Sequence, residues 1–185
     1  MAQTVATVDL RALDLAPGAE VRRRLRVPPV DLRLGGQDYR TEPESPEVEL
    51  RVSRSLSGLH LSLRTEVALV GPCWRCLEPA RVPLQVRTDE FVAEGRPADA
   101  PFDEDLDSAY VRDRLLDIAL WTRDAIAEAM PAVVLCREGC AGLCPVCGAD
   151  RNLGDCGCAR EETDSRWDAL RGLAERLGRE DPPQG

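Results

Sequence analysis

Apolar and polar residues alternate along much of the first 93 residues, which is the pattern of β-strands that bury one face. In the segment 21–27, Val21, Leu25 and Val27 fall on one face and Arg22, Arg24 and Arg26 on the other, and only Arg23 breaks the pattern. Segments 47–57 and 59–70 show the same alternation of apolar and polar residues, whereas the composition of 35–47 predicts a loop. We therefore expect an antiparallel β-rich region over residues 1–93.

A helical pattern follows an acidic, proline-containing connector at residues 94–108. Between Ala109 and Met130 apolar residues recur every three or four positions, and Asp107 or Ser108 stands where a helix cap is needed. The apolar face is wide, so this helix is expected to pack on the sheet. Helix and link together occupy residues 109–135.

The rest of the chain predicts a small cysteine-rich module at residues 136–178, followed by a disordered tail at 179–185. The module ends in a short amphipathic helix from about Ser165, with its apolar stripe at Trp167, Leu170, Leu173, Ala174 and Leu177. The predicted fold class is α+β: an antiparallel β-rich N-terminal part with a long packing helix and a small C-terminal zinc-ribbon module.

The charge and composition of the chain limit the classes of molecule that it is expected to bind. The net charge is −9, while residues 1–65 carry ten arginines against nine acidic residues. An acidic chain attracts phosphate poorly, so contact with nucleic acid must be local or pass through a protein. The sequence shows no export signal and no apolar run long enough to cross a membrane, so we expect a cytoplasmic protein without a membrane partner. No phosphate-binding loop is present, and no small-molecule substrate is expected.

Eight cysteines form four pairs: Cys73 and Cys76, Cys136 and Cys140, Cys144 and Cys147, Cys156 and Cys158. Cys-Pro-Val-Cys-Gly at 144–148 is typical of a zinc knuckle, because two intervening residues let both sulfurs reach one ion from a tight turn. The glycine that follows suits the left-handed conformation that such a turn needs. Only eight residues separate this pair from Cys156, so Cys144, Cys147, Cys156 and Cys158 are predicted to form one tetrathiolate site.

The four remaining cysteines then form the other site. Cys136 and Cys140 are left with a single possible partner pair, Cys73 and Cys76, and no cysteine is left over. This second assignment ties the end of a predicted strand to the segment after the helix. Two structural zinc ions are therefore expected.

Other roles for the thiols are weaker. An iron–sulfur cluster also takes four thiolates, but the knuckle spacing with Cys-Gly-Cys favours zinc. A thioredoxin-like Cys-x-x-Cys stands at the start of a helix in a βαβ unit, whereas Cys73 follows a β-rich segment. Disulfides are disfavoured in a reducing compartment. Four thiolates leave a zinc ion no open position for catalysis.

No other catalytic set stands out, so we expect a protein that is not an enzyme. The single histidine, His60, alternates with polar residues on the solvent face of a predicted strand. Trp74 and Arg75, within the first cysteine pair, are candidates for contact with RNA or with a protein partner.

Taken together, these residues resemble the YceD family of large ribosomal RNA subunit accumulation proteins. The resemblance rests on Cys73-Trp-Arg-Cys76, on the segment 136–148 ending in Gly-Leu-Cys-Pro-Val-Cys-Gly, on Asn152-Leu153, on Cys156-Gly-Cys158 and on Ser165-Arg166-Trp167. It implies a non-enzymatic role in ribosome biogenesis, supporting the processing or accumulation of large-subunit (23S) rRNA. The implied partners are an rRNA precursor or ribosomal and assembly proteins. The alternatives are a zinc-stabilised adaptor for an unrelated protein, or a metal- or thiol-dependent RNA-processing enzyme.

Overall fold

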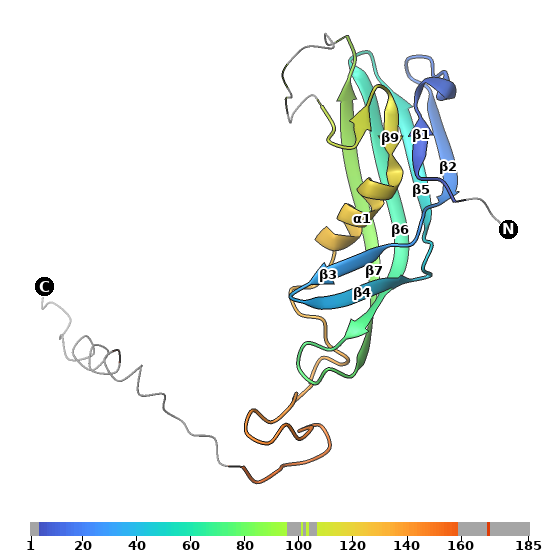
Figure 1. Ribbon diagram of the computed structural model, residues 1–185. Coiled ribbons are helices and arrows are strands. Elements are labelled where there is room, and N and C mark those ends of the chain that lie inside the picture. Colours follow the sequence, from blue (N-terminus) through green and yellow to red (C-terminus); the bar gives the residue numbers. More distant parts are fainter. Residues whose placement is uncertain (1–3, 96–100, 102, 104–106, 159–169, 171–185) are drawn as a thin grey trace, which may run out of the picture. The chain divides into compact units, whose positions relative to one another are not determined.

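The computed structural model describes residues 4–95, 101, 103, 107–158 and 170, and the chain divides into compact units at 1–142 and 143–185 (Figure 1). The larger unit is built on a six-stranded antiparallel sheet in the order β2-β5-β6-β4-β3, with β7 on the other edge of β6. Its strands are β2 (Glu20–Arg26), β3 (Asp31–Leu34), β4 (Gln37–Glu42), β5 (Glu47–Arg54), β6 (Gly58–Pro72) and β7 (Pro79–Ala93). The prediction of an antiparallel β-rich N-terminal part is thus confirmed. The prediction of a loop over 35–47 is wrong, since β4 lies within it.

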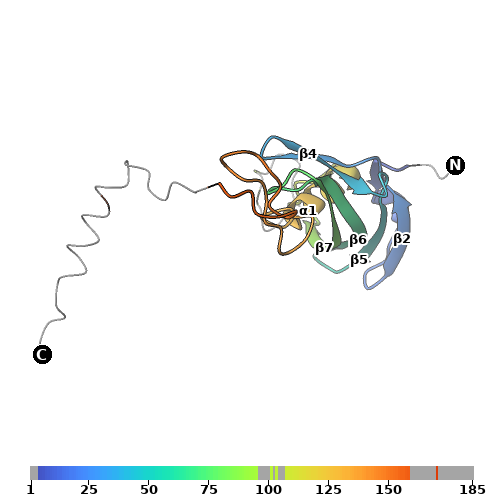
Figure 2. The same ribbon diagram turned by 90° about the horizontal axis from the view of Figure 1, so that it is seen from below.

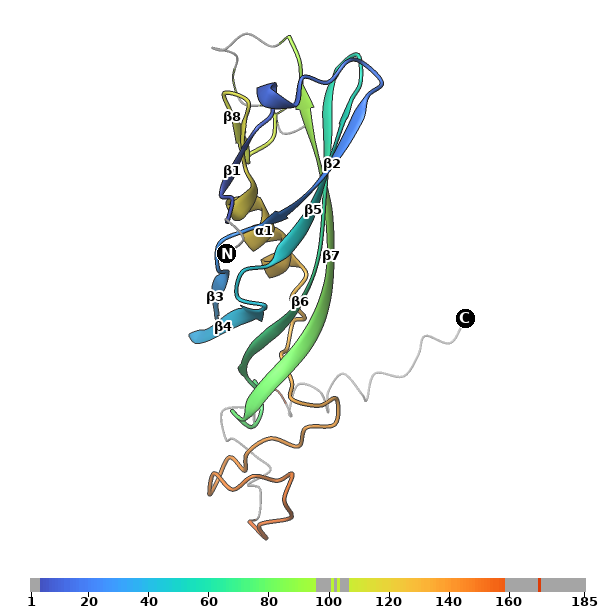
Figure 3. The ribbon, with the colours of Figure 1, turned by 90° about the vertical axis from the view of Figure 1, so that its right-hand side faces the viewer.

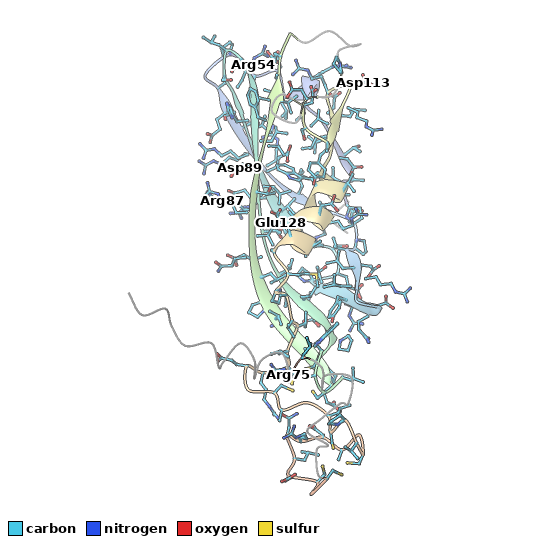
Figure 4. All side chains as sticks on the ribbon, turned by 90° about the vertical axis from the view of Figure 1, so that its left-hand side faces the viewer. Arg54, Arg75, Arg87, Asp89, Asp113 and Glu128 are labelled. Carbon is cyan, nitrogen blue, oxygen red and sulfur yellow. The ribbon has the colours of Figure 1, made fainter. Side chains whose placement is uncertain are left out.

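Strand alternation separates a buried face from a charged one. Leu50 of β5 lies opposite Leu63 of β6, and both are almost fully buried. On the other face, charged residues pair across the strands: Arg24, Glu49, Arg64 and Arg87 follow one another across β2, β5, β6 and β7. Figure 4 shows Arg87 and Asp89 on the side of the sheet away from the helix. One face therefore builds the core and the other meets solvent.

A second, three-stranded sheet lies in the same unit. It consists of β1 (Thr7–Asp9), β9 (Leu115–Asp117) and β8 (Val111–Arg112) in the order β1-β9-β8, and a short 3-10 turn at Arg11–Leu13 follows β1. The two-residue turn between β8 and β9 is made by Asp113 and Arg114, both in the left-handed region at φ 50° and 65°. This is the geometry of a tight hairpin turn.

The helix α1 (Ile118–Glu128) is shorter than the predicted helix over Ala109–Met130. Its N-cap is Asp117, whose carboxylate accepts a hydrogen bond from the backbone N–H of Leu120 at 2.9 Å. The prediction that Asp107 or Ser108 caps the helix is therefore wrong. Residues 109–117 carry apolar residues at helical spacing, but pairing with β1 draws them into the hairpin. Leu116 is consequently buried, while Leu115 on the alternate face is 48% exposed.

Packing of α1 on the sheet follows its apolar period. Its buried residues are Ile118, Trp121, Thr122, Ala125 and Ile126. Trp121 belongs to the same core cluster as the buried leucines and valines of β5 and β6. Figure 3 shows the long strands β6 and β7 curving, with α1 and the small sheet on the concave side, and Figure 2 shows α1 beside the same strands from below. The predicted packing of a helix on the sheet is confirmed, so the fold is α+β with mostly antiparallel sheets and one described helix.

The smaller unit is described at residues 143–158 and at Leu170. The predicted helix from Ser165, apart from Leu170, and the predicted tail at 179–185 lie outside the described residues, as does most of the predicted connector at 94–108. Among the described helices, none has the length and apolar character that crossing a membrane requires.

Candidate metal centres

The first cysteine pair lies at the tip of the longest hairpin. Strands β6 and β7 pair along their whole length, from Gly58 opposite Ala93 to Pro72 opposite Pro79. Residues 73–78 connect them, so this connection is the Cys-Trp-Arg-Cys segment itself. Figure 4 places Arg75 at this tip.

Three contacts join the tip to the segment that follows α1. The backbone N–H of Trp74 donates to the carbonyl of Val134 at 2.8 Å, and the Arg75 guanidinium donates to the carbonyl of Cys140 at 2.8 Å. Gly142, at φ 75°, passes so close to the backbone of Arg75 that an added Cβ would lie 3.0 Å from its carbonyl oxygen. These contacts place Cys136 and Cys140 beside the tip although they are about sixty residues away in sequence.

Cys73, Cys76, Cys136 and Cys140, the first quartet, gather their four sulfur atoms within 4.8 Å of one another. The Sγ atoms of Cys73 and Cys140 are 3.8 Å apart, and those of Cys76 and Cys136 are 3.6 Å apart. A disulfide would need about 2.0 Å. Four sulfurs at the zinc–sulfur distance of about 2.3 Å from one tetrahedral ion stand about 3.8 Å apart. The donor set and its spacing therefore fit a single metal ion.

Cys144, Cys147, Cys156 and Cys158, the second quartet, lie in the smaller unit, and their sulfurs also lie within 4.8 Å of one another. The second quartet is less shielded from solvent than the first. Cys147 and Cys158 are exposed, whereas Cys73, Cys76 and Cys140 of the first quartet are buried. The structure thus brings the cysteines together in the two groups that ligand counting predicts. Both groups are able to hold a metal ion.

The two Cys-x-x-Cys turns have the same backbone hydrogen bonds. In the first, the N–H of Leu77 donates to the carbonyl of Cys73 at 3.0 Å, and the N–H of Cys73 to that of Glu78 at 2.8 Å. In the second, Gly148 donates to Cys144, and Cys144 to Ala149, both at 2.8 Å. The residue after the second cysteine is left-handed in both, at φ 63° for Leu77 and 74° for Gly148. Both turns are therefore knuckles of one design.

Leu77 is the unusual member of this comparison. A side chain in the left-handed region costs about 1 kcal/mol that glycine avoids. Leu77 is also 57% exposed, so burial within its own chain offsets little of that cost. Sequence reasoning missed Leu77, although aligning the two knuckles places it opposite Gly148 and was a usable signal.

The thiols of the first quartet have strongly shifted pKa values. Burial acts to raise the pKa of Cys73, but three backbone N–H groups bond to its sulfur and lower the pKa to about 6. They belong to Cys136, Cys76 and Arg75. The N–H of Glu78 acts to lower the pKa of Cys76, but burial and the neighbouring thiols raise it to about 12.

The second quartet repeats this division. The N–H groups of Cys147 and Val146 lower the pKa of Cys144 to about 6. The neighbouring thiols of Cys147 and Cys156 raise the pKa of Cys158 to about 12. In each quartet, one thiolate forms readily and opposes ionisation of the others. Four thiolates at this spacing therefore need a cation to compensate their charge.

The other predicted site residues lie as follows. Trp74 is 56% exposed and packs over the turn between β3 and β4, where a Cβ on Gly35 would lie 2.8 Å from its ring. Arg75 is exposed, and its guanidinium donates a hydrogen bond to the carbonyl of Cys140. His60 lies on the charged face of the sheet with its ring 4.7 Å from that of Phe91. That Trp74 and Arg75 contact RNA or a partner stays a prediction.

Comparison with known proteins identifies the family. A family model described as large ribosomal RNA subunit accumulation protein YceD matches residues 61–174, more than half of the chain. The match includes all eight cysteines. The chain therefore belongs to the YceD family.

Individual relatives come from bacteria and from a plant, and the plant relative has the family name. The chain is 31% identical over 177 residues to uncharacterized proteins of Mycobacterium bovis and Mycobacterium tuberculosis, covering 94% of this chain and 82% of each relative. It is 34% identical over 62 residues to the large ribosomal RNA subunit accumulation protein YCED homolog 1, chloroplastic, of Arabidopsis thaliana. That match covers 34% of this chain and 19% of the relative. No solved structure matches the chain.

Proposed function

We propose that this member of the YceD family is a non-enzymatic factor of ribosome biogenesis that supports the processing or accumulation of large-subunit (23S) rRNA and holds two structural zinc ions. The process is supported by the family description and by the name of the Arabidopsis relative. The observation that carries the metal part is the pair of four-sulfur cages.

The cages favour zinc over an iron–sulfur cluster. A cluster places several iron and sulfide atoms between its thiolates and needs a wider cage, whereas these sulfurs lie within 4.8 Å of one another. Four thiolates at tetrahedral spacing, held by knuckle turns, are the usual arrangement of a structural zinc-ribbon site. We therefore assign the small unit as a zinc ribbon and the first quartet as a staple within the larger unit.

The same cages support a role that is not enzymatic. Four protein ligands saturate a tetrahedral ion and leave no position for water or substrate. The protein's residues would instead orient the ion: the backbone N–H groups that bond to Cys73 and Cys144 hold each knuckle in the ligating conformation. Bound zinc would compensate the charge of the thiolates and cross-link the chain. We expect this cross-link to hold the surface that partners bind in one conformation.

The proposal is tested in a strain lacking the gene and complemented with variants. Wild-type protein and the control Leu56→Ser, an exposed residue on the turn between β5 and β6 that belongs to neither quartet, should restore mature 23S rRNA relative to 16S rRNA. Cys73→Ser should not. Purified wild-type protein should contain about two zinc ions per chain. An unchanged 23S to 16S ratio in the deletion strain would overturn the assigned process, and one metal ion per chain would overturn one of the cages.

A further inference from the structure

The surface around the tip of the β6–β7 hairpin is rich in exposed apolar side chains. Leu34, Trp74 and Leu77 are 48%, 56% and 57% exposed. Beside them a groove of about 690 Å³ opens between the β3–β4 hairpin and the last residues of β6, with Leu32, Tyr39, Val70, Pro72, Leu77 and Pro79 among its lining. We call this groove with Trp74 and Leu34 at its border the knuckle groove.

Leu77 is the strongest sign that the knuckle groove binds something. The knuckle needs a left-handed residue after its second cysteine, and the second knuckle meets this need with Gly148. The first uses a leucine with the same backbone hydrogen bonds, at a conformational cost. Its side chain lines the groove while remaining mostly exposed, so the fold itself gains little from it. A costly apolar side chain held toward solvent is expected where a partner will cover it.

The floor of the groove is built to be firm and apolar. Tyr39 is 3% exposed, packs against Gly71 where any Cβ would collide with its ring, and directs its hydroxyl toward the carbonyl of Pro72 at 3.4 Å. The two prolines at the end of the hairpin, Pro72 and Pro79, lie opposite each other. Such a surface receives an aliphatic or aromatic side chain without rearrangement.

The charges around the groove argue against a phosphate backbone as the occupant. Its lining contains two aspartates and two arginines, and these balance. Arg33 pairs with Asp38 at 3.5 Å, and Asp31 lies opposite Arg40 in the β3–β4 register. A neutral, apolar groove complements an uncharged segment, whereas RNA requires an excess of positive charge.

The sheet edge beside the groove adds backbone groups. Among the described strands, β3 pairs with β4 alone, so no described strand pairs with its outer edge. An extended segment that pairs with this edge places alternate side chains toward the groove.

We propose that the knuckle groove binds an extended apolar segment of a protein partner, with Leu77 and Trp74 as the main contacts. The expectation that this partner belongs to the large ribosomal subunit or its assembly rests on the proposed function, whereas the groove itself does not.

The test begins with photocrosslinking in cells. A photoreactive benzoylphenylalanine replaces Leu77, Trp74 or, as control, Leu56, which is 92% exposed on the turn between β5 and β6. Crosslinks to one protein are expected at Leu77 and Trp74 and not at Leu56.

Binding of that purified protein is then measured with wild type, Leu77→Gly and Leu56→Ser. Leu77→Gly should weaken binding about tenfold and leave the melting temperature equal or higher, because glycine relieves the left-handed strain. Leu56→Ser should change neither.

Each other outcome is decisive. Crosslinks from Leu77 to RNA, crosslinks no stronger than at Leu56, or unchanged affinity in Leu77→Gly would overturn the groove as a protein-binding surface. Specific, Leu77-dependent binding of a protein unrelated to the large subunit would support the groove and contradict the proposed function instead.

Discussion

Replacement of Cys73 by serine tests the staple that we assign to the first quartet. The cross-link lost with the ion joins Cys73 to Cys140, which are 67 residues apart. Closing a loop of that length restricts the unfolded chain by about 4 kcal/mol at 25 °C in the chain-entropy description of covalent cross-links. We expect the unit at 1–142 to lose stability of that order, which corresponds to a drop in melting temperature of roughly 10 to 15 °C.

The rest of the larger unit is expected to remain folded in this variant. Its main apolar cluster, which includes Leu50, Leu63 and Trp121, is built from the sheet, β9 and α1 and contains no cysteine. Domains of this size are commonly stable by about 5 to 15 kcal/mol, so a loss of about 4 kcal/mol leaves most molecules native at 25 °C. Loss of amide protection should therefore concentrate at the hairpin tip and at residues 134–142.

The matched control is Cys147→Ser in the second quartet. Elemental analysis should give about one zinc ion per chain for each variant, and hydrogen exchange followed by mass spectrometry should locate the change. Cys147→Ser should leave the hairpin tip as protected as in wild type. The reasoning fails if either variant loses both ions, or if Cys73→Ser loses its ion with a shift in melting temperature below about 2 °C.

Three further predictions follow from burial and capping. A chelator should remove the ion of the second quartet first, because Cys147 and Cys158 are exposed while most of the first quartet is buried; simultaneous release, followed with a chromogenic chelator, would contradict this. Trp121→Ala should cost about 3 to 5 kcal/mol in urea denaturation, because the ring is 1% exposed in the core; a cost below about 1 kcal/mol would contradict that packing. Asp117→Ala should cost about 1 kcal/mol by removing the cap of α1, whereas Asp107→Ala should cost less; equal effects in thermal denaturation would refute Asp117 as the cap.

The grouping of the cysteines was predictable because it depends on counting. Cys144, Cys147, Cys156 and Cys158 are close in sequence, and the four others then have a single way to form a tetrathiolate set. Strands with one buried face were predictable for a similar reason, since the alternation in 21–27 survives in β2. The spacing of residues in the sequence is sufficient for a prediction where the residues that contact one another are also close in sequence.

Prediction failed where a distant segment decides the local structure. Residues 109–117 have apolar residues that suit a helix, but β1, more than a hundred residues earlier, pairs with 115–117 and makes that segment a strand. Likewise, the polar composition of 35–47 predicts a loop, yet pairing of Arg40 with Val70 extends the sheet there. The groove could not be predicted either, because its lining comes from four strands and from a knuckle that meet only in the fold.

The positions of Trp74 and Leu77 make partner binding depend on the first ion. Both residues lie in the turn that Cys73 and Cys76 form, and that turn is held by contacts to the segment containing Cys140. Cys140→Ser should therefore weaken binding of the crosslinked partner at least as much as Leu77→Gly, although it removes no groove side chain, and Cys147→Ser should leave binding unchanged. Full affinity in Cys140→Ser would mean that the groove forms without its metal, and the first quartet would then have no part in presenting Leu77.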